Sequence, residues 1–278
     1  MEELTIATPC LRLAARAFGA ASGRPVLGLH GWLDNAATFD RLAPLLPEGL
    51  RLVSLDQAGH GRSERRGEGV YHFIDYVADA IAAADALGWG RFSLLGHSLG
   101  AGVAALVAGT IPERIERLVM LEGLGPWTDA AAAAPATLRA AMAADVKPPR
   151  LSGRGVPDLE AAAQIRKRAG DLSLEAARTL MSRGVVAGPE GLVWAADPRL
   201  RAPSRLRLTE AQVVAFLGAI ACPTMIVRAS RGWPVDPAME AARVAAIRGV
   251  TVARVDGGHH VHLDDPAAVA AAVSGFLR

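Results

Sequence analysis

The sequence predicts an α/β protein in which a mostly parallel sheet is covered by helices on both faces. Short apolar runs alternate with helical stretches along most of the chain, and polar or glycine-rich turns follow the ends of those runs. This alternation is typical of parallel sheets, which bind their ligands at the carboxyl ends of the strands. We therefore expect one site at that edge of the sheet.

The first third of the chain contains four of the apolar runs and two helical stretches. A Pro-containing turn joins the first two runs, and the others are short enough for strands buried on both faces. The predicted strands are Leu4–Ile6, Leu11–Ala17, Val26–Leu29 and Arg51–Leu55. The predicted helices are Ala36–Leu46, with Asp34 or Asn35 as its cap, and His72–Leu87, with Gly88 as its stop.

A tight turn carries the strongest motif. A buried strand over 91–95 is followed by Gly-His-Ser-Leu-Gly at 96–100 and then by an Ala-rich helix starting at about Leu99. Glycines at 96 and 100 let two backbones approach closely, so Ser98 can adopt a strained conformation with its hydroxyl exposed at the tip. Because the strand and the helix that this motif requires are both present, we interpret Ser98 as a nucleophile.

The alternation stops after a further strand, Ile115–Leu121, and returns near residue 218. Between these points lie Ala-rich helical stretches broken by Pro, Gly and Arg, with no evident strand. We expect residues 1–124 and 218–278 to form the two parts of the core and residues 125–217 to form a helical cap. The second part should contain strands Thr224–Val227 and Val250–Val255, helix Pro237–Ile247 and a C-terminal helix.

Composition excludes several classes of function. Thirty basic and 28 acidic residues give a net charge of +2, which is too small to favour nucleic acid or an acidic membrane surface. Cys10 and Cys222 form neither a disulfide framework nor a zinc pattern. No secretory signal or membrane-spanning run is evident, so we expect a cytoplasmic protein. We also expect that it uses no metal or cofactor.

A serine nucleophile needs an imidazole base held by a carboxylate. His259 follows the last predicted strand behind two glycines and is the best of the seven histidines, with His260 and His262 as its rivals. Adjacent histidines rarely face one metal, so these three make a poor zinc site. For the oxyanion hole, we expect the backbone N–H groups of Leu99 and Trp32.

Four motifs make the chain resemble the α/β-hydrolase superfamily, in its branch with a helical cap. They are His-Gly-Trp at 30–32, Asp-x-x-Gly-His-Gly-x-Ser at 56–63, Gly-His-Ser-Leu-Gly at 96–100 and Gly-His-x-x-His-x-x-x-Pro at 258–266. Residues 30–42 resemble the serine hydrolase-like proteins more narrowly. The resemblance implies an eight-stranded sheet, with Ser98 as nucleophile and His259 as base. A serine at the turn also distinguishes the chain from the haloalkane dehalogenases and epoxide hydrolases, which have an aspartate there.

The acid departs from the family pattern. The usual acid position, after the seventh strand, falls on Gly232. The carboxylate could come from Asp236, four residues later, or from Glu122, which follows the sixth strand at an alternative position found in some capped relatives. Both preserve the chain order of serine, acid and histidine. We favour Glu122 and keep Asp236 as the alternative.

The expected reaction is hydrolysis of a carboxylic ester of a small to medium apolar substrate through an acyl-enzyme, with water as the second substrate. The same three residues could instead cleave a thioester or a carbon–carbon bond. A third hypothesis is a non-catalytic homologue that binds a small ligand.

Overall fold

An eight-stranded sheet forms the centre of the computed structural model, which describes residues 1–67, 70–145 and 155–278. The strand order is β1-β2-β4-β3-β5-β6-β9-β10, and only the pairs β1–β2 and β2–β4 are antiparallel. The strands are β1 (Glu2–Ala7), β2 (Arg12–Phe18), β3 (Arg24–Leu29), β4 (Leu50–Leu55), β5 (Phe92–His97), β6 (Ile115–Leu121), β9 (Thr224–Arg231) and β10 (Thr251–Gly258). The predicted mostly parallel sheet is therefore confirmed.

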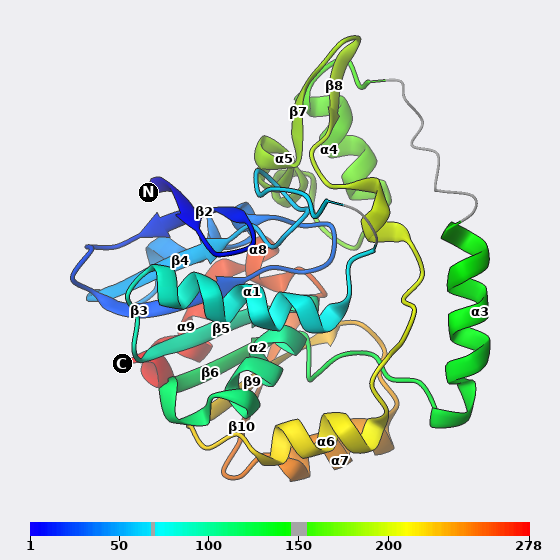
Figure 1. The fold of residues 1–278 in the computed structure, drawn as a ribbon. Coiled ribbons are helices and arrows are strands. Elements are labelled where there is room, and N and C mark those ends of the chain that lie inside the picture. The colour runs from blue at the N-terminus through cyan, green and yellow to red at the C-terminus, as the bar shows by residue number, and fades with distance from the viewer. Residues whose placement is uncertain (68–69, 146–154) are drawn as a thin grey trace.

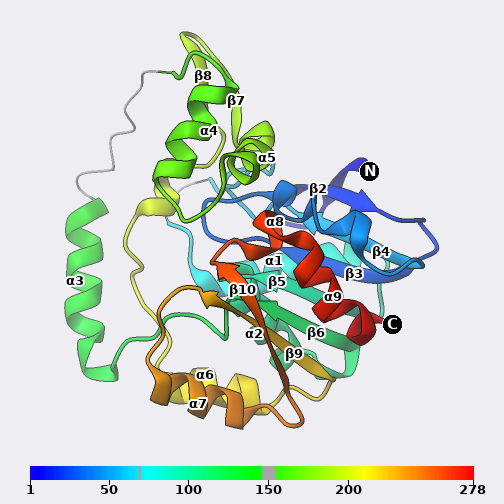
Figure 2. The same cartoon turned by 180° about the vertical axis from the view of Figure 1, so that it is seen from behind.

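Helices cover both faces of this sheet (Figures 1 and 2). One face packs against α1 (Phe73–Ala86), α2 (Leu99–Thr110), α6 (Glu210–Gly218) and α7 (Pro237–Ala246). The other packs against α9 (Pro266–Leu277), which follows the short α8 (Val261–Asp264). Neighbouring residues of β3 show how one strand serves both cores, since Leu27 packs on the first face and Val26 on the second.

The predicted stops and caps explain where several helices begin and end. Gly88 has a φ of 72°, in the left-handed region just after α1, where a side chain would be strained. Asn35 caps the segment after β3 by accepting a hydrogen bond from the N–H of Ala37. Asp265 caps α9 in the same way, accepting from the N–H of Ala268.

The predicted helix over 36–46 is wrong. The chain forms two 3₁₀ segments there, Ala36–Phe39 and Ala43–Leu45. Ser54 donates its hydroxyl hydrogen to the carbonyl of Ala36, which an α-helix would use internally, and Pro44 lacks the N–H that would bond the carbonyl of Asp40. A side chain of strand β4 therefore occupies a backbone carbonyl that an α-helix over 36–46 would need for its own hydrogen bonds.

The segment between β6 and β9 also contains a strand pair that we did not predict. Strands β7 (Val185–Gly188) and β8 (Gly191–Trp194) form an antiparallel hairpin. In the sequence, this hairpin follows the three helices α3 (Ala134–Asp145), α4 (Leu159–Arg168) and α5 (Leu174–Gly184). Each strand has only four residues, too few to show a period, but the Gly-Pro-Glu-Gly turn between Val185-Val186 and Leu192-Val193 was a usable signal.

Helices α4 and α5 and the hairpin stand beyond one edge of the sheet (Figures 1 and 2). Their small core includes Leu180 of α5 and Leu263 of α8, so the segment packs on the chain just after residue 259. Arg183 of α5 has a fully buried side chain and donates from Nε to the Asp56 carboxylate at 2.7 Å. Helix α6 lies instead against α2 and α7, and the domain limits at 124 and 217 stay predictions.

Candidate functional site

Ser98 occupies a strained turn between β5 and α2. Its φ of 52° is in a region that non-glycine residues rarely adopt, at a cost of about 1–3 kcal/mol. The flanking glycines permit it: a Cβ at Gly96 would lie 2.4 Å from the carbonyl oxygen of Gly100, and a Cβ at Gly100 would lie 2.1 Å from that of Leu29. The turn therefore holds the serine at the tip between two tightly packed backbones.

His259 lies next to this serine. It follows β10 directly, and its Nε2 is 2.9 Å from Ser98 Oγ. The ring of His97, one residue before Ser98, donates from Nε2 to the backbone carbonyl of His259 at 2.9 Å. The turn that carries Ser98 and the His259 segment are thus bonded to each other twice, although 161 positions separate Ser98 from His259.

Glu122 completes a row of three groups. Its Oε2 is 3.3 Å from His259 Nδ1, and its side chain is almost fully buried. The carboxylate also accepts the backbone N–H of Ala229 at 2.6 Å and that of Trp233 at 3.2 Å. Burial raises the pKa of Glu122, but the bonds from His259 and Ala229 outweigh it and hold the pKa below its usual value. The carboxylate is therefore ionised at neutral pH.

The alternative acid, Asp236, is engaged elsewhere. It is the N-cap of α7, where its Oδ1 accepts the N–H groups of Ala238 and Met239, each at 2.9 Å. Gly232, at the usual acid position, leaves the room that Glu122 occupies, because a Cβ there would lie 1.9 Å from Glu122 Oε2. The two acid positions exclude each other sterically.

The segments expected to supply the oxyanion hole also meet. Leu99 begins α2. Because Gly100 has no Cβ, the first turn of α2 can lie against the backbone carbonyls at the end of β3. Trp32 lies just beyond, in a turn closed by the Asp34 N–H donating to the Gly31 carbonyl at 3.1 Å. The Trp32 ring is half-exposed rather than a core aromatic.

The rival imidazoles bond to other partners. His262 Nε2 lies 2.8 Å from Thr38 Oγ1, and His260 Nε2 lies 3.1 Å from Asp34 Oδ2. The rings of His97 and His260 pack beside His259, with centroids 4.9 and 5.3 Å from its own. The His262 ring packs against those two rings, at 4.1 Å from His97 and 6.0 Å from His260. The imidazole of His259 is thus supported by packed histidine rings, two of which, His260 and His262, follow it in the sequence after β10.

An acid-sensitive fold is expected from four of the seven histidines. Burial lowers the pKa of His30 to about 4 and that of His60 to about 3, and it also lowers the pKa values of His97 and His262. Unfolded imidazoles titrate near pH 6.5, so the unfolded state binds more protons as the pH falls below that value, and stability is lost.

From pH 7 to pH 6, we expect these histidines to reduce the free energy of unfolding by about 2 kcal/mol, after an offset from Asp40. Burial raises the pKa of Asp40 to about 6, so its proton uptake opposes the loss. Urea unfolding followed by circular dichroism at the two pH values measures the change. A midpoint that stays constant would contradict neutral burial of the four rings.

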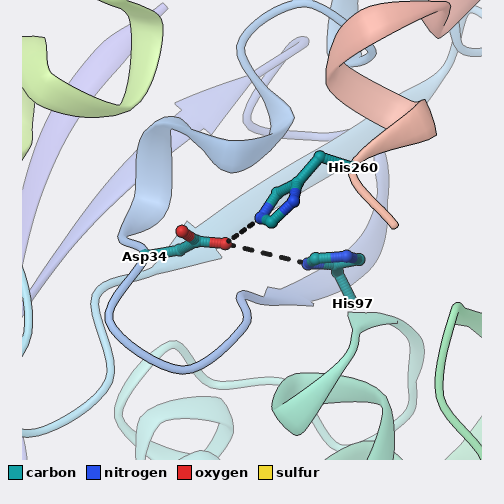
Figure 3. Close-up of side chains that lie close together, drawn as sticks. All are labelled: Asp34, His97 and His260. Atoms are coloured by element: carbon teal, nitrogen blue, oxygen red, sulfur yellow. Dashed lines mark hydrogen bonds and ion pairs between the residues drawn. The ribbon is translucent and has the colours of Figure 1, made fainter. Parts of the chain in front are cut away.

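One buried group in the described part of the chain has the residue types of a metal site. Asp34, His97 and His260 each place one ligand atom within 4.8 Å of the other two (Figure 3). However, Arg166 Nη2 of α4 lies 2.8 Å from Asp34 Oδ1 and 3.2 Å from His260 Nε2. A guanidinium already neutralises the carboxylate, so we interpret the group as an ion-pair network.

Sequence reasoning missed this network and an aromatic pair. Arg166 gave no signal, because it lies among the charged residues of an amphipathic helix. The sequence around Asp34 indicates only a helix cap. Trp233 packs edge-on to His259 at 5.4 Å and lies 6.3 Å from Trp127, and both indoles are more than half exposed. Their signal was position, since each lies a few residues beyond the carboxyl end of a strand.

The chain belongs to the α/β-hydrolase fold family, whose model matches residues 24–266. It is 31% identical to a serine hydrolase-like protein of Danio rerio, over 99% of this chain and 88% of that protein. A probable serine hydrolase of Drosophila melanogaster is 30% identical over 100% and 88% of the two chains.

Two solved structures extend the likeness. A hypothetical protein of Pseudomonas aeruginosa PAO1 is 45% identical with a TM-score of 0.93, covering all of both chains. The thioesterase domain from the curacin biosynthetic pathway is 25% identical with a TM-score of 0.84, covering 98% of this chain and 99% of that one. Among the described residues, no helix is both long and apolar enough to cross a membrane.

Proposed function

We propose that this protein is a serine hydrolase that cleaves carboxylic esters bearing a small to medium apolar group. The observation that carries the proposal is the row of Ser98 Oγ, His259 Nε2 at 2.9 Å, and Glu122 Oε2 at 3.3 Å from the other ring nitrogen. A hydroxyl, an imidazole and a buried carboxylate in this order are the groups that acyl transfer requires.

The proposed reaction has two halves. His259 Nε2 takes the proton of Ser98 as Oγ attacks the ester carbonyl, and Glu122 holds the ring by accepting from Nδ1 and stabilises its positive charge. The backbone N–H groups of Trp32 and Leu99 bind the oxyanion. The imidazolium then protonates the departing alcohol. Water, deprotonated by His259, then attacks the acyl carbonyl. As the bond to Ser98 Oγ breaks and the acid leaves, His259 returns the proton to Oγ.

The substrate class is supported by the surroundings of His259. Trp233 lies beside His259, and Trp127 lies beside Trp233 in turn, so two exposed indole rings form a surface that favours an apolar acyl or alcohol group. The likeness to a thioesterase domain supports a second candidate, hydrolysis of an acyl thioester by the same residues. Rates on matched p-nitrophenyl esters and acyl thioesters distinguish the two candidates.

A fluorophosphonate probe tests the proposal, because it phosphonylates only an activated serine. We expect stoichiometric labelling of the folded protein, located at Ser98 by peptide mass spectrometry, and none after denaturation in urea. Absence of labelling in the folded protein would contradict a serine hydrolase and favour the non-catalytic, ligand-binding alternative.

A further inference from the structure

Asp34 lies where four parts of the molecule meet. It belongs to the turn after β3, and its side chain is almost completely buried. Its Oδ2 faces His260 Nε2 at 3.1 Å and His97 Nδ1 at 3.9 Å, as Figure 3 shows. Its Oδ1 accepts from Arg166 Nη2 at 2.8 Å. The four parts are therefore the turn after β3, the nucleophile turn, the segment after β10, and helix α4.

Arg166 is the only one of these partners that comes from the segment between β6 and β9. A buried carboxylate without a cation is costly, and removing one partner of a buried ion pair is strongly destabilising because it leaves the other charge uncompensated. Burial raises the pKa of Asp34, but His260 and Arg166 hold it well below its usual range, so the carboxylate stays charged. The position of α4 against the core therefore determines whether the Asp34 carboxylate has a cation beside it.

Each core partner of Asp34 is adjacent in sequence to a group of the proposed reaction. His260 follows His259, and His97 precedes Ser98 while also donating to the His259 carbonyl. The Asp34 N–H closes the turn that carries Trp32. A shift of Asp34 would therefore move the base and the Trp32 N–H relative to Ser98, and misplacement by about 1 Å can cost about 100-fold in rate.

We propose that Arg166 and Asp34 are positioning residues: by pairing with Asp34, Arg166 makes the alignment of Ser98, His259 and the Trp32 turn depend on the seating of α4. This inference rests on the proposed hydrolase function. Neither residue touches the reacting atoms. The pair acts by holding the turn after β3 and the segment after β10 in place.

The first test separates kcat from KM on a p-nitrophenyl ester. We expect Arg166→Gln to lower kcat about 10- to 100-fold with KM nearly unchanged, and Arg166→Lys to recover most of the loss because it restores the cation. The matched control is Arg168→Gln, an exposed residue of the same helix, which should match the wild type. A loss confined to KM, or equal losses in both helix variants, would overturn the proposal.

The double variant Asp34→Asn with Arg166→Gln tests the charge itself. Because it leaves no unpaired buried carboxylate, we expect its kcat to exceed that of Arg166→Gln alone. If the loss of kcat in the double variant equalled the product of the losses in Arg166→Gln alone and Asp34→Asn alone, the two residues would act independently, which would overturn the pairing.

Hydrogen–deuterium exchange gives a readout that does not need enzyme activity. Arg166→Gln should raise exchange in α4, in the turn over 31–35 and in the segment over 257–262, whereas Arg168→Gln should not. Raised exchange in α4 alone would overturn the coupling. If the wild type is neither labelled by the fluorophosphonate nor active on esters, the proposed function fails, and exchange still decides whether Arg166 holds the two core segments.

Discussion

Ser98→Ala is expected to abolish ester hydrolysis, lowering kcat by about 10⁶-fold. Without Oγ there is no atom to form the acyl-enzyme, and His259 has no hydroxyl to deprotonate. Removing the nucleophile of such a set costs about as much as removing all its members, because they act as a unit. Burst-phase and steady-state kinetics on a p-nitrophenyl ester measure the loss, and fluorophosphonate labelling should disappear with it.

The fold should survive this change. The backbone strain at residue 98 is the same for alanine as for serine, since both have a Cβ and no larger branch at that position. Ser182→Ala, an exposed serine of α5, is the matched control and should retain wild-type kinetics. Wild-type turnover by folded Ser98→Ala would refute the assignment of the nucleophile.

Glu122→Gln is expected to lower kcat by about 10⁴-fold while leaving KM nearly unchanged. The amide cannot stabilise the imidazolium, and its NH₂ group can turn toward His259 and favour the wrong tautomer. The matched comparison is Asp236→Asn, which should keep activity within about threefold because asparagine caps a helix as well as aspartate does. Steady-state kinetics on both variants decide between the two carboxylates.

The steric exclusion between Glu122 and Gly232 permits a sharper test of the acid. Gly232→Asp alone should destabilise the fold, because its Cβ would meet the Glu122 carboxylate. In the Glu122→Gly background that space is empty, so the same aspartate should recover part of the lost kcat. If Asp236→Asn proved to be the severely impaired variant and Glu122→Gln remained active, the assignment of Glu122 would be refuted.

Local patterns predicted most of the sheet and the strained turn at Ser98. The apolar runs became strands within a few residues of their expected limits, and the glycines around Ser98 have the close backbone contacts that the motif requires. The prediction failed over 36–46, because Ser54 of a later strand captures a carbonyl there. It failed again at the β7–β8 hairpin, because four-residue strands are too short to show a period.

The sequence by itself determined the class of fold, the strained serine and the choice of His259 among seven histidines for testing, because each depends on residues adjacent in the chain. Only the tertiary structure decided that Glu122, rather than Asp236, lies beside His259, and that Arg166 reaches Asp34. Those pairings join residues 137 and 132 positions apart, and such distances follow from how the elements pack rather than from any local pattern.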